Sequence, residues 1–377
     1  MMKKICNYTP IMLMADSKGK TPMQIIATVC VAALLLTGFQ TNPANACTAF
    51  THKAADGIVF AGNMDLLVPT GGLVAVNRRG IAKRNFRSNK DGTIANWTTR
   101  YGSVSFNIAG KGFAWGGLNE AGLAIQTLEV RTEEYPKPDH RIPLDNGSWI
   151  QYALDMAGSV ADVIAMEKTI RPVKDGGYGF HAIVADANGA SAVIEYIDGK
   201  MVVYTGKALP VRALSNISYE RALWSYRNGG PRWWWSGMGD SPERFAAVAR
   251  RVEQYEPGLH KNSTRYTLGS LVHAANQYTL WSVVYNIDKR KIWFRTVRSG
   301  NTKHMKLSDF DFSCDAPSLI LDVDTTEPGH IADKFQPYDR QTNQPVFTEA
   351  ITNYGIPVST KDSAMVMDHI DSYQCAP

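Results

Sequence analysis

The sequence lacks the patterns that mark several common enzyme classes. It contains no Gly-x-Ser-x-Gly nucleophile elbow, no His-Glu-x-x-His zinc helix and no glycine-rich phosphate loop ending in Lys-Ser or Lys-Thr. Its eight histidines show no metal-ligand spacing. These absences argue against an elbow-type serine hydrolase, a zinc enzyme and a nucleotide-dependent enzyme, and neither a metal nor another cofactor is expected.

Charge of a single sign is also missing. The chain has 40 Lys and Arg against 35 Asp and Glu, and neither sign dominates a segment or a tail. Because nucleic-acid binding depends on clustered basic side chains, no nucleic-acid partner is expected. The expected partner is a small-molecule substrate.

No apolar run is long enough to span a bilayer. The run at 25–39 follows a basic amino-terminal stretch and has the length of the hydrophobic part of a secretory signal. Pro43 then ends any helix, and Ala44-Asn45-Ala46 has the small-x-small pattern after which signal peptidase cuts. We therefore expect residues 1–46 to be a signal peptide. The mature protein, starting at Cys47, is expected to be periplasmic or secreted, without a membrane anchor.

A cysteine directly after a signal peptide has a second interpretation, as the lipid-attachment site of a lipoprotein. Lipoprotein cleavage normally follows a Leu-rich segment directly, whereas residues 40–46 separate Phe39 from Cys47. Ala44 also occupies the position that Leu usually holds. Lipidation is the less favoured alternative, and it would leave no free amine at Cys47.

The chain has only five cysteines. Cys6 and Cys30 would leave with the signal peptide. In an oxidising compartment Cys314 and Cys375 could form a disulfide that holds the carboxyl-terminal tail, or both could stay reduced. Cys47 is the odd cysteine of an exported chain, which is a reason to consider it reactive.

Strand patterns outnumber helical ones. Strands are predicted at 48–53, 58–63, 103–109, 123–130, 181–185, 192–197, 201–205, 280–286 and 291–296. Helices are predicted at 149–169, 243–254 and 346–354. Runs of strands around a few helices favour a layered α+β single domain over 47–330, with 331–377 as an extension of the same domain.

The first two predicted strands form a hairpin around Ala55-Asp56-Gly57. A three-residue loop would pair Cys47 with Asp65, and a two-residue loop would shift its partner to Leu66. In either case Asp65 returns to within one residue of Cys47, and directly opposed side chains lie about 5 Å apart.

Cleavage after Ala46 would give Cys47 its own general base. An α-amine has an ordinary pKa of about 7.7–8.0, so a useful fraction is neutral near physiological pH. The neutral amine can take the thiol proton and later protonate a leaving amine, which makes a histidine unnecessary. Asp65 would hold and orient that amine. The expected chemistry is amide hydrolysis through a thioester acyl-enzyme.

Five short motifs follow one another along the chain: Cys47-Thr48-Ala49-Phe50, Gly62-Asn63-Met64-Asp65, Gly117-Leu118-Asn119-Glu120-Ala121-Gly122-Leu123, Leu214-Ser215-Asn216 and Ser241-Pro242-Glu243-Arg244-Phe245. Each motif is weak alone. Their order and spacing resemble the choloylglycine hydrolase family, which contains penicillin V acylases and conjugated bile salt hydrolases. The similarity extends from Cys47 to about Leu321.

The resemblance implies a fold and a set of roles. The fold is the N-terminal nucleophile (Ntn) hydrolase αββα sandwich, which often assembles as a homotetramer. Cys47 is similar to the family's nucleophile, and Asp65 to the residue that contacts its amine. Asn216 resembles the side-chain donor of the oxyanion hole, the Glu129 main-chain N–H the second donor, and Arg244 the charged residue near the nucleophile. Losing one oxyanion donor costs about 3 kcal/mol of transition-state stabilisation.

Two positions depart from the family pattern. Relatives usually carry Arg where Gly62 stands, close to the thiol, and Arg84 or Arg244 would have to replace that charge in space. Glu129 stands where relatives carry Asn, Tyr or Trp, and its negative charge disfavours anionic groups nearby. This favours neutral acyl amides such as acyl homoserine lactones over anionic conjugated bile salts, which stay an alternative, and penicillin V is kept as a further candidate substrate.

A function of another class also stays open. The missing Arg at position 62 is compatible with an exported binding protein that kept the fold without catalysis. The run Trp233-Trp234-Trp235 fits either an apolar substrate mouth or the packing of a loop.

Overall fold

The computed structural model describes residues 47–377 apart from 67–69, 89–91, 93, 131–133, 174–178, 230–239, 261 and 356. The predicted signal peptide and the run of three tryptophans lie outside the described residues. Within the described part of the chain, every helix is too short or too polar to cross a membrane.

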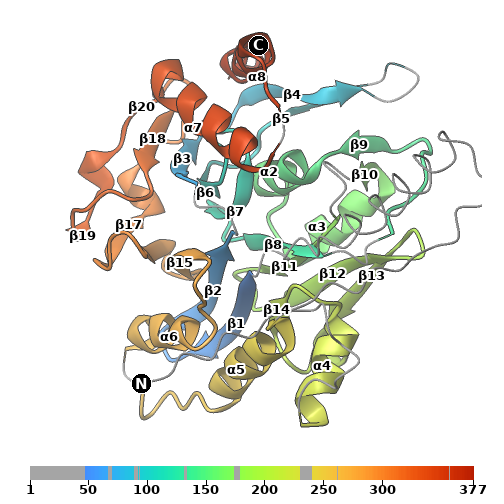
Figure 1. The fold of residues 1–377 in the computed structure, drawn as a ribbon, viewed down its shortest axis with the longest axis vertical. Helices are drawn as coiled ribbons and strands as arrows, with labels where there is room; N and C mark the ends of the chain where they lie inside the picture. The colour runs from blue at the N-terminus through green and yellow to red at the C-terminus, as the bar shows by residue number, and fades with distance from the viewer. Residues whose placement is uncertain are drawn as a thin grey trace, which may run out of the picture. The chain divides into compact units, whose positions relative to one another are not determined.

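Two large β-sheets form the centre of the fold (Figure 1). The seven-stranded sheet has the order β14 (Ala213–Ser215), β1 (Thr48–Ala54), β2 (Gly57–Asp65), β15 (Thr279–Asn286), β16 (Lys291–Thr296), β17 (Lys303–Lys306) and β19 (Gly329–His330). The nine-stranded sheet has the order β13 (Lys200–Thr205), β12 (Ser191–Ile197), β11 (Gly179–Ala185), β8 (Ala124–Val130), β7 (Ala114–Asn119), β6 (Ser103–Asn107), β3 (Leu73–Asn77), β18 (Leu319–Asp322) and β20 (Gln336–Pro337).

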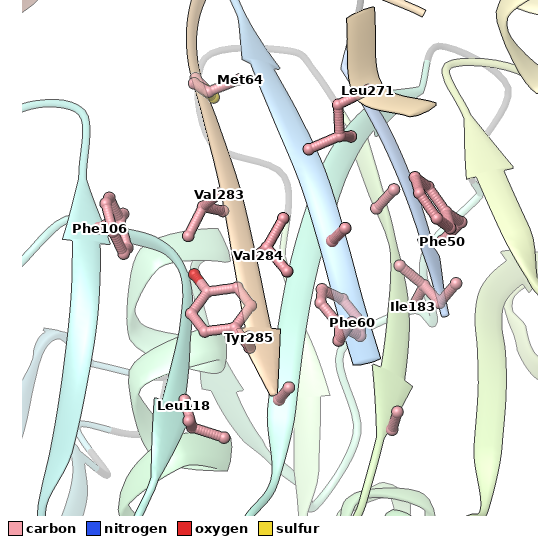
Figure 2. Close-up of a cluster of buried hydrophobic side chains, with 14 of the residues drawn as sticks. Phe50, Phe60, Met64, Phe106, Leu118, Ile183, Leu271, Val283, Val284 and Tyr285 are labelled. Atoms are coloured by element: carbon pink, nitrogen blue, oxygen red, sulfur yellow. The ribbon is translucent and has the colours of Figure 1, made fainter. Parts of the chain in front are cut away.

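The main core lies between these two sheets. Figure 2 shows Phe60 of β2 and Tyr285 of β15 with Phe106, which comes from β6 of the other sheet. The Tyr285 ring lies 5.9 Å from that of Phe60 and 6.2 Å from that of Phe106. All three side chains are buried, and burying each one stabilises the fold by about 1.5–3 kcal/mol. The sheets therefore pack face to face.

Helices cover the outer faces of the two sheets. α5 (Ser241–Glu253) packs on β1 and β14, α6 (Ser263–Val272) on β2 and β15, and α4 (Tyr219–Arg227) on α5. On the other sheet α2 (Asn146–Met156) packs on β7 and β8, and shares a second apolar cluster with α3 (Val160–Ala165). This order of layers confirms the expected α+β fold, an αββα sandwich.

The single helix predicted at 149–169 was wrong, because the structure has two helices there. Ala157 is extended after α2 (φ −99°, ψ 130°). Ser159 then caps α3, and its side chain accepts a hydrogen bond from the Asp162 main-chain N–H. A capping serine starts a new helix at a place where apolar spacing alone continues without a break.

The β1–β2 hairpin has the shorter of the two loops that the sequence left open. Ala54 pairs with Gly57 across a two-residue loop. Gly57 belongs to β2, where its φ of +127° suits a residue without a side chain. Both partners predicted for Cys47 were therefore wrong, since the continued register places Met64 opposite it. Asp65 comes next along β2, so the expected separation of at most one residue is confirmed.

The carboxyl-terminal residues pack against the β6–β7 end of the nine-stranded sheet. The remaining helices and strands are β4 (Ile81–Ser88), β5 (Ile94–Thr98), β9 (Ile142–Leu144), β10 (Ile170–Pro172), α7 (Arg340–Asn353), α8 (Thr360–Asp371) and β21 (Gln374–Cys375). Phe347 of α7 and Met367 of α8 form an apolar cluster with Ala109. β21 pairs with β4, and its Cys375 forms a disulfide with Cys314.

Replacing both cysteines of this disulfide by serine is expected to lower the free energy of unfolding by about 2–4 kcal/mol. The reason is that the bond restricts the unfolded chain by joining positions separated by 61 residues. Chemical unfolding of the oxidised protein and of the Cys314→Ser/Cys375→Ser variant measures the difference. Reductant should lower the free energy of unfolding of the wild type by the same amount and leave that of the variant unchanged. Equal stability of the two oxidised samples would contradict the prediction.

Candidate active site

Cys47 lies directly before β1, and its side chain is fully buried. The Asp65 main-chain N–H donates to the Cys47 sulfur at 3.5 Å, and the Asp65 carbonyl oxygen lies 3.6 Å from the same sulfur. The Met64 sulfur is 3.8 Å away. The hairpin thus holds the thiol against the end of β2.

The Asp65 carboxylate is fully buried and accepts no hydrogen bond of normal geometry from the described residues. Arg244 Nη1 lies 4.0 Å from Asp65 Oδ2. Burial raises the pKa of Asp65 to about 7, against the lowering effects of Arg244 and the Thr279 hydroxyl. A buried carboxylate without donors is costly, so the site is suited to one more positive group.

Asn216 reaches the same place because β14 pairs with β1. Ser215 lies opposite Thr48 in this pair, so the next residue lies beside the start of β1. The Asn216 amide nitrogen donates to the Glu129 carbonyl oxygen at 2.7 Å. Its amide oxygen accepts from Arg244 Nη2 at 3.3 Å. These two partners fix the orientation of the amide, and its second N–H has no acceptor among the described residues.

Arg244 connects the cluster. It lies near the start of α5, which packs across β14 and β1, and its side chain is buried. Its guanidinium donates to the Cys47 carbonyl oxygen and to the Thr48 hydroxyl. It also donates to Ser241 Oγ and to Asp240 Oδ1, both at 2.8 Å. The Asp240 carboxylate balances part of the buried charge. With the bond to the Asn216 oxygen, Arg244 donates five hydrogen bonds, which fix its side chain in one conformation.

The structure brings all the predicted site residues together in one cluster, formed by Cys47, Asp65, Glu129, Asn216 and Arg244. Arg84 is not part of it, since it is exposed on β4, where its carbonyl oxygen accepts from Tyr373. Sequence reasoning missed Asp240 and Ser241 as partners of Arg244. Both residues come directly before the helix predicted at 243–254, within one turn of Arg244, and this spacing could have identified them as its partners.

The environment of Cys47 keeps its thiol protonated in the uncleaved chain. Burial, with the carboxylates of Asp65 and Glu129, raises the pKa of Cys47 to about 12, and Arg244 opposes this only in part. In that chain the Cys47 nitrogen is an amide bonded to Ala46, and an amide nitrogen is not a base. A thiolate therefore needs a base that the uncleaved chain does not supply at this position.

A side chain from the other sheet fills the space beside Gly62, where the family resemblance implies an Arg. A Cβ atom at Gly62 would lie 2.0 Å from Gln126 Oε1. Gln126 belongs to β8, is buried, and donates from its amide to the Asn63 carbonyl oxygen at 3.1 Å. Glycine at position 62 and glutamine at position 126 therefore form one packing unit. The two positions lie far apart in the chain, and no sequence pattern connects them.

Gly62→Ala is expected to lower the free energy of unfolding by about 1–3 kcal/mol, because the added methyl displaces the buried Gln126 amide from its hydrogen bond to the Asn63 carbonyl oxygen. Gly62→Ala/Gln126→Ala should lose less than the sum of the single changes, by at least about 1 kcal/mol. Urea unfolding of the four proteins measures this coupling. Gly71→Ala is the control, since a Cβ there meets no atom within 4 Å. A loss in the double variant equal to the sum of the two single losses would contradict the packing unit.

One group of side chains in the described part of the chain is close enough to share a metal ion. It consists of Cys314, Asp315 and Cys375. Both cysteines form the disulfide, so the group offers a single carboxylate as an ordinary ligand.

The sequence is similar to that of characterised amidohydrolases. Residues 47–223 match the family described as linear amide C–N hydrolases, choloylglycine hydrolase family. The penicillin V acylase of Pectobacterium atrosepticum is 32% identical over 261 residues, which are 63% of this chain and 68% of that protein.

Solved structures share the fold. Penicillin V acylase from Agrobacterium tumefaciens aligns with a TM-score of 0.64 and 21% identity, over 78% of this chain and 98% of that chain. A mutant of the conjugated bile acid hydrolase from Clostridium perfringens aligns with a TM-score of 0.58 and 16% identity, over 78% of this chain and 96% of that chain. Each alignment covers the neighbour almost completely and leaves part of this chain unmatched.

Proposed function

Because the chain belongs to the choloylglycine hydrolase family and is an amidohydrolase of linear amides, we propose that Cys47 of the mature protein attacks the amide to form a thioester. The observation that carries this proposal is the contact network around the thiol. Asp65 holds the sulfur, and Arg244 binds both the Cys47 carbonyl and Asn216. Such a buried set of polar groups is the arrangement that a cysteine nucleophile with its own amine requires.

The reaction begins with the amine that signal-peptide removal exposes. This amine takes the thiol proton, and the sulfur attacks the amide carbonyl carbon. The protonated amine then gives its proton to the leaving nitrogen, the C–N bond breaks and the thioester remains. The amine next takes a proton from water, which attacks the thioester and releases the acid. Asp65, whose buried carboxylate lacks donors, holds the ammonium form in place.

Two donors are proposed for the oxyanion, the Asn216 side chain and the Glu129 main-chain N–H. Asn216 keeps one amide N–H after its bond to the Glu129 carbonyl oxygen. The N–H and C=O of a strand residue project from the same strand edge, so the Glu129 N–H faces the edge where Asn216 lies. Arg244 holds the Asn216 oxygen and thereby aims its nitrogen. Each oxyanion donor contributes about 3 kcal/mol to transition-state stabilisation.

The substrate that we favour is an amide of the penicillin V type, in which a neutral acyl group is attached to the nitrogen. The relative with 32% identity is a penicillin V acylase, whereas the bile acid hydrolase at 16% identity supports only the fold. Glu129 is buried and helps to raise the pKa of Cys47. Its field disfavours an anionic group close to the amide, as in glycine and taurine conjugates. Acyl homoserine lactones lack such a group and fit the same site chemistry.

A hydrolysis panel on protein with a verified Cys47 terminus tests this function. We expect kcat/KM for penicillin V or an acyl homoserine lactone to exceed that for glycocholate by at least about tenfold, because pocket discrimination of this kind is worth 1–3 kcal/mol. Mass spectrometry of quenched samples should show an acyl group on Cys47 that decays as product appears. Binding without turnover would indicate the non-catalytic binding protein, and a preference for glycocholate would overturn the substrate assignment.

We also propose that the mature protein is exported and starts with an unmodified Cys47. The intact mass of protein from its natural host distinguishes this form from an uncleaved or lipidated one. Light scattering on the same sample tests the homotetramer that the family resemblance implies.

A further inference from the structure

A cavity of about 320 Å³ lies under the carboxyl-terminal helices. No residue of the Cys47 cluster lines it. Its floor comes from β3, β4 and the loops that follow β3 and β6, and its roof comes from residues just before α7, at the end of α8 and after it. The volume is that of a site for a small organic molecule.

Three cationic side chains line this cavity: Arg78, Lys83 and Lys111. Lys83 is paired with the buried Asp155 at 2.8 Å. The single lining carboxylate, Asp371, is already engaged, because it accepts from the Tyr338 hydroxyl at 2.7 Å and from Arg340 at 3.3 Å.

The other two cations have no carboxylate partner within ion-pair distance in the described structure. Arg78 donates to the main-chain oxygens of Cys314 and Ala316 at 2.6 and 2.8 Å, which are neutral acceptors. The Lys111 ammonium lies 5.1 Å from the centre of the Tyr338 ring and forms no hydrogen bond with a described residue. Positive charge therefore exceeds negative charge in this cavity.

The uncompensated charge affects Lys111 itself. Burial, with Lys83 and Arg78, lowers the pKa of Lys111 to about 7, although Asp155 and Asp371 act in the opposite direction. An anion in the cavity would reverse this effect, because it stabilises the protonated amine.

We propose that this cavity binds a small organic carboxylate between the carboxyl-terminal helices and the sheets. Lys111 and Arg78 hold the carboxylate group. The rings of Tyr338 and Tyr373, with the Ile370 side chain, form walls for its apolar body. Since floor and roof come from separate parts of the chain, the ligand joins the extension at 331–377 to the core of the domain.

The test is calorimetry on the mature protein with phenylacetate, the neutral phenylacetamide and inorganic phosphate. Phenylacetate should bind and raise the melting temperature, and phenylacetamide should not bind. Lys111→Met should weaken phenylacetate binding by at least about tenfold, while Lys361→Met, an exposed lysine on α8, should leave it unchanged. Arg78→Gln is a second variant in case Lys111→Met does not fold, and the same loss is expected. Hydrolysis at Cys47 should be unaffected in Lys111→Met.

The pH dependence gives an independent readout. The protonated form of Lys111 binds the anion, so affinity should fall by about tenfold from pH 6 to pH 8, with proton uptake on binding at the higher pH. Unchanged affinity in both Lys111→Met and Arg78→Gln, or absence of phenylacetate binding, would overturn the proposal. Phosphate binding as tight as that of phenylacetate would overturn the assignment to an organic carboxylate.

Discussion

Replacement of Cys47 by alanine in the mature protein is expected to lower kcat for a linear amide by a factor on the order of 10⁴ or more. In the proposed mechanism the thiolate forms the covalent intermediate. Within the described residues no other free thiol is present, since Cys314 and Cys375 are joined in a disulfide. Cys47→Ser should lose nearly as much, because its hydroxyl is far harder to deprotonate. The measurement is product release from penicillin V over hours at high protein concentration.

A matched control is available for this experiment. Cys314→Ser/Cys375→Ser removes the other two cysteine sulfurs of residues 47–377 and should keep its activity at 25 °C. Circular dichroism and chemical unfolding should show that Cys47→Ala is folded, since the change removes one buried atom and leaves the β1–β2 pairing intact. Wild-type turnover by a folded Cys47→Ala protein would remove Cys47 from the mechanism.

The sequence predicted the residues that cluster around Cys47, but it could not give their geometry. The turn residues Ala55-Asp56-Gly57 were enough to predict that Asp65 lies close to Cys47, because a hairpin fixes the distance between its two strands. The same residues were not enough to predict the register between β1 and β2, which depends on whether Gly57 is a loop residue or a strand residue. A one-residue error of this kind changes which side chain lies opposite the thiol.

Contacts between segments far apart in the chain were beyond sequence reasoning. The pairing of β14 with β1 carries Asn216 to the thiol, and nothing in the local sequence of either strand specifies this neighbour. The fit of Gln126 over Gly62 is of the same kind. α8 was missed because its few buried side chains, such as Met367 and Ile370, are separated by polar residues and are covered by α7 and the sheet end.

The layered fold was predictable for the opposite reason. Strand and helix patterns are local, and strands that are buried on both faces, such as β11, contain continuous apolar runs. The predicted ends of helices were wrong where a single polar residue determines the end. Ser159 ends the continuity of the predicted long helix by capping the next one.

An extra alanine in front of Cys47 is expected to reduce kcat by about 10²–10⁴-fold, the usual contribution of a general base. The added residue converts the amine into an amide, while the thiol and its contacts stay in place. The measurement compares kcat of the mature protein with kcat of the extended protein, after mass spectrometry has verified both termini. As a control, the Cys47 thiol of both proteins should remain titratable after unfolding. Equal activity of the two would show that the amine is not the base.

The same pair of proteins tests the role of Asp65 through stability. In the extended protein no ammonium reaches the buried carboxylate, so the pKa of Asp65 is about 7 in the folded state against an ordinary value near 4. The folded state therefore keeps a proton that the unfolded chain releases, and the free energy of unfolding falls as the pH rises from about 4 to 7. The loss is about 4 kcal/mol over that range.

In the mature protein the ammonium of Cys47 is expected to stabilise the ionised carboxylate and to lower its pKa, so most of this pH dependence should disappear. Asp65→Asn should remove it from the extended protein as well, because an amide does not titrate, and it should make that protein more stable at pH 7. In the mature protein the same substitution should reduce activity, since the amine loses its partner. Identical pH profiles of stability for the extended and mature proteins would mean that the amine and Asp65 do not interact. The amine would then have to be oriented by another group, with the Arg244 network the remaining candidate.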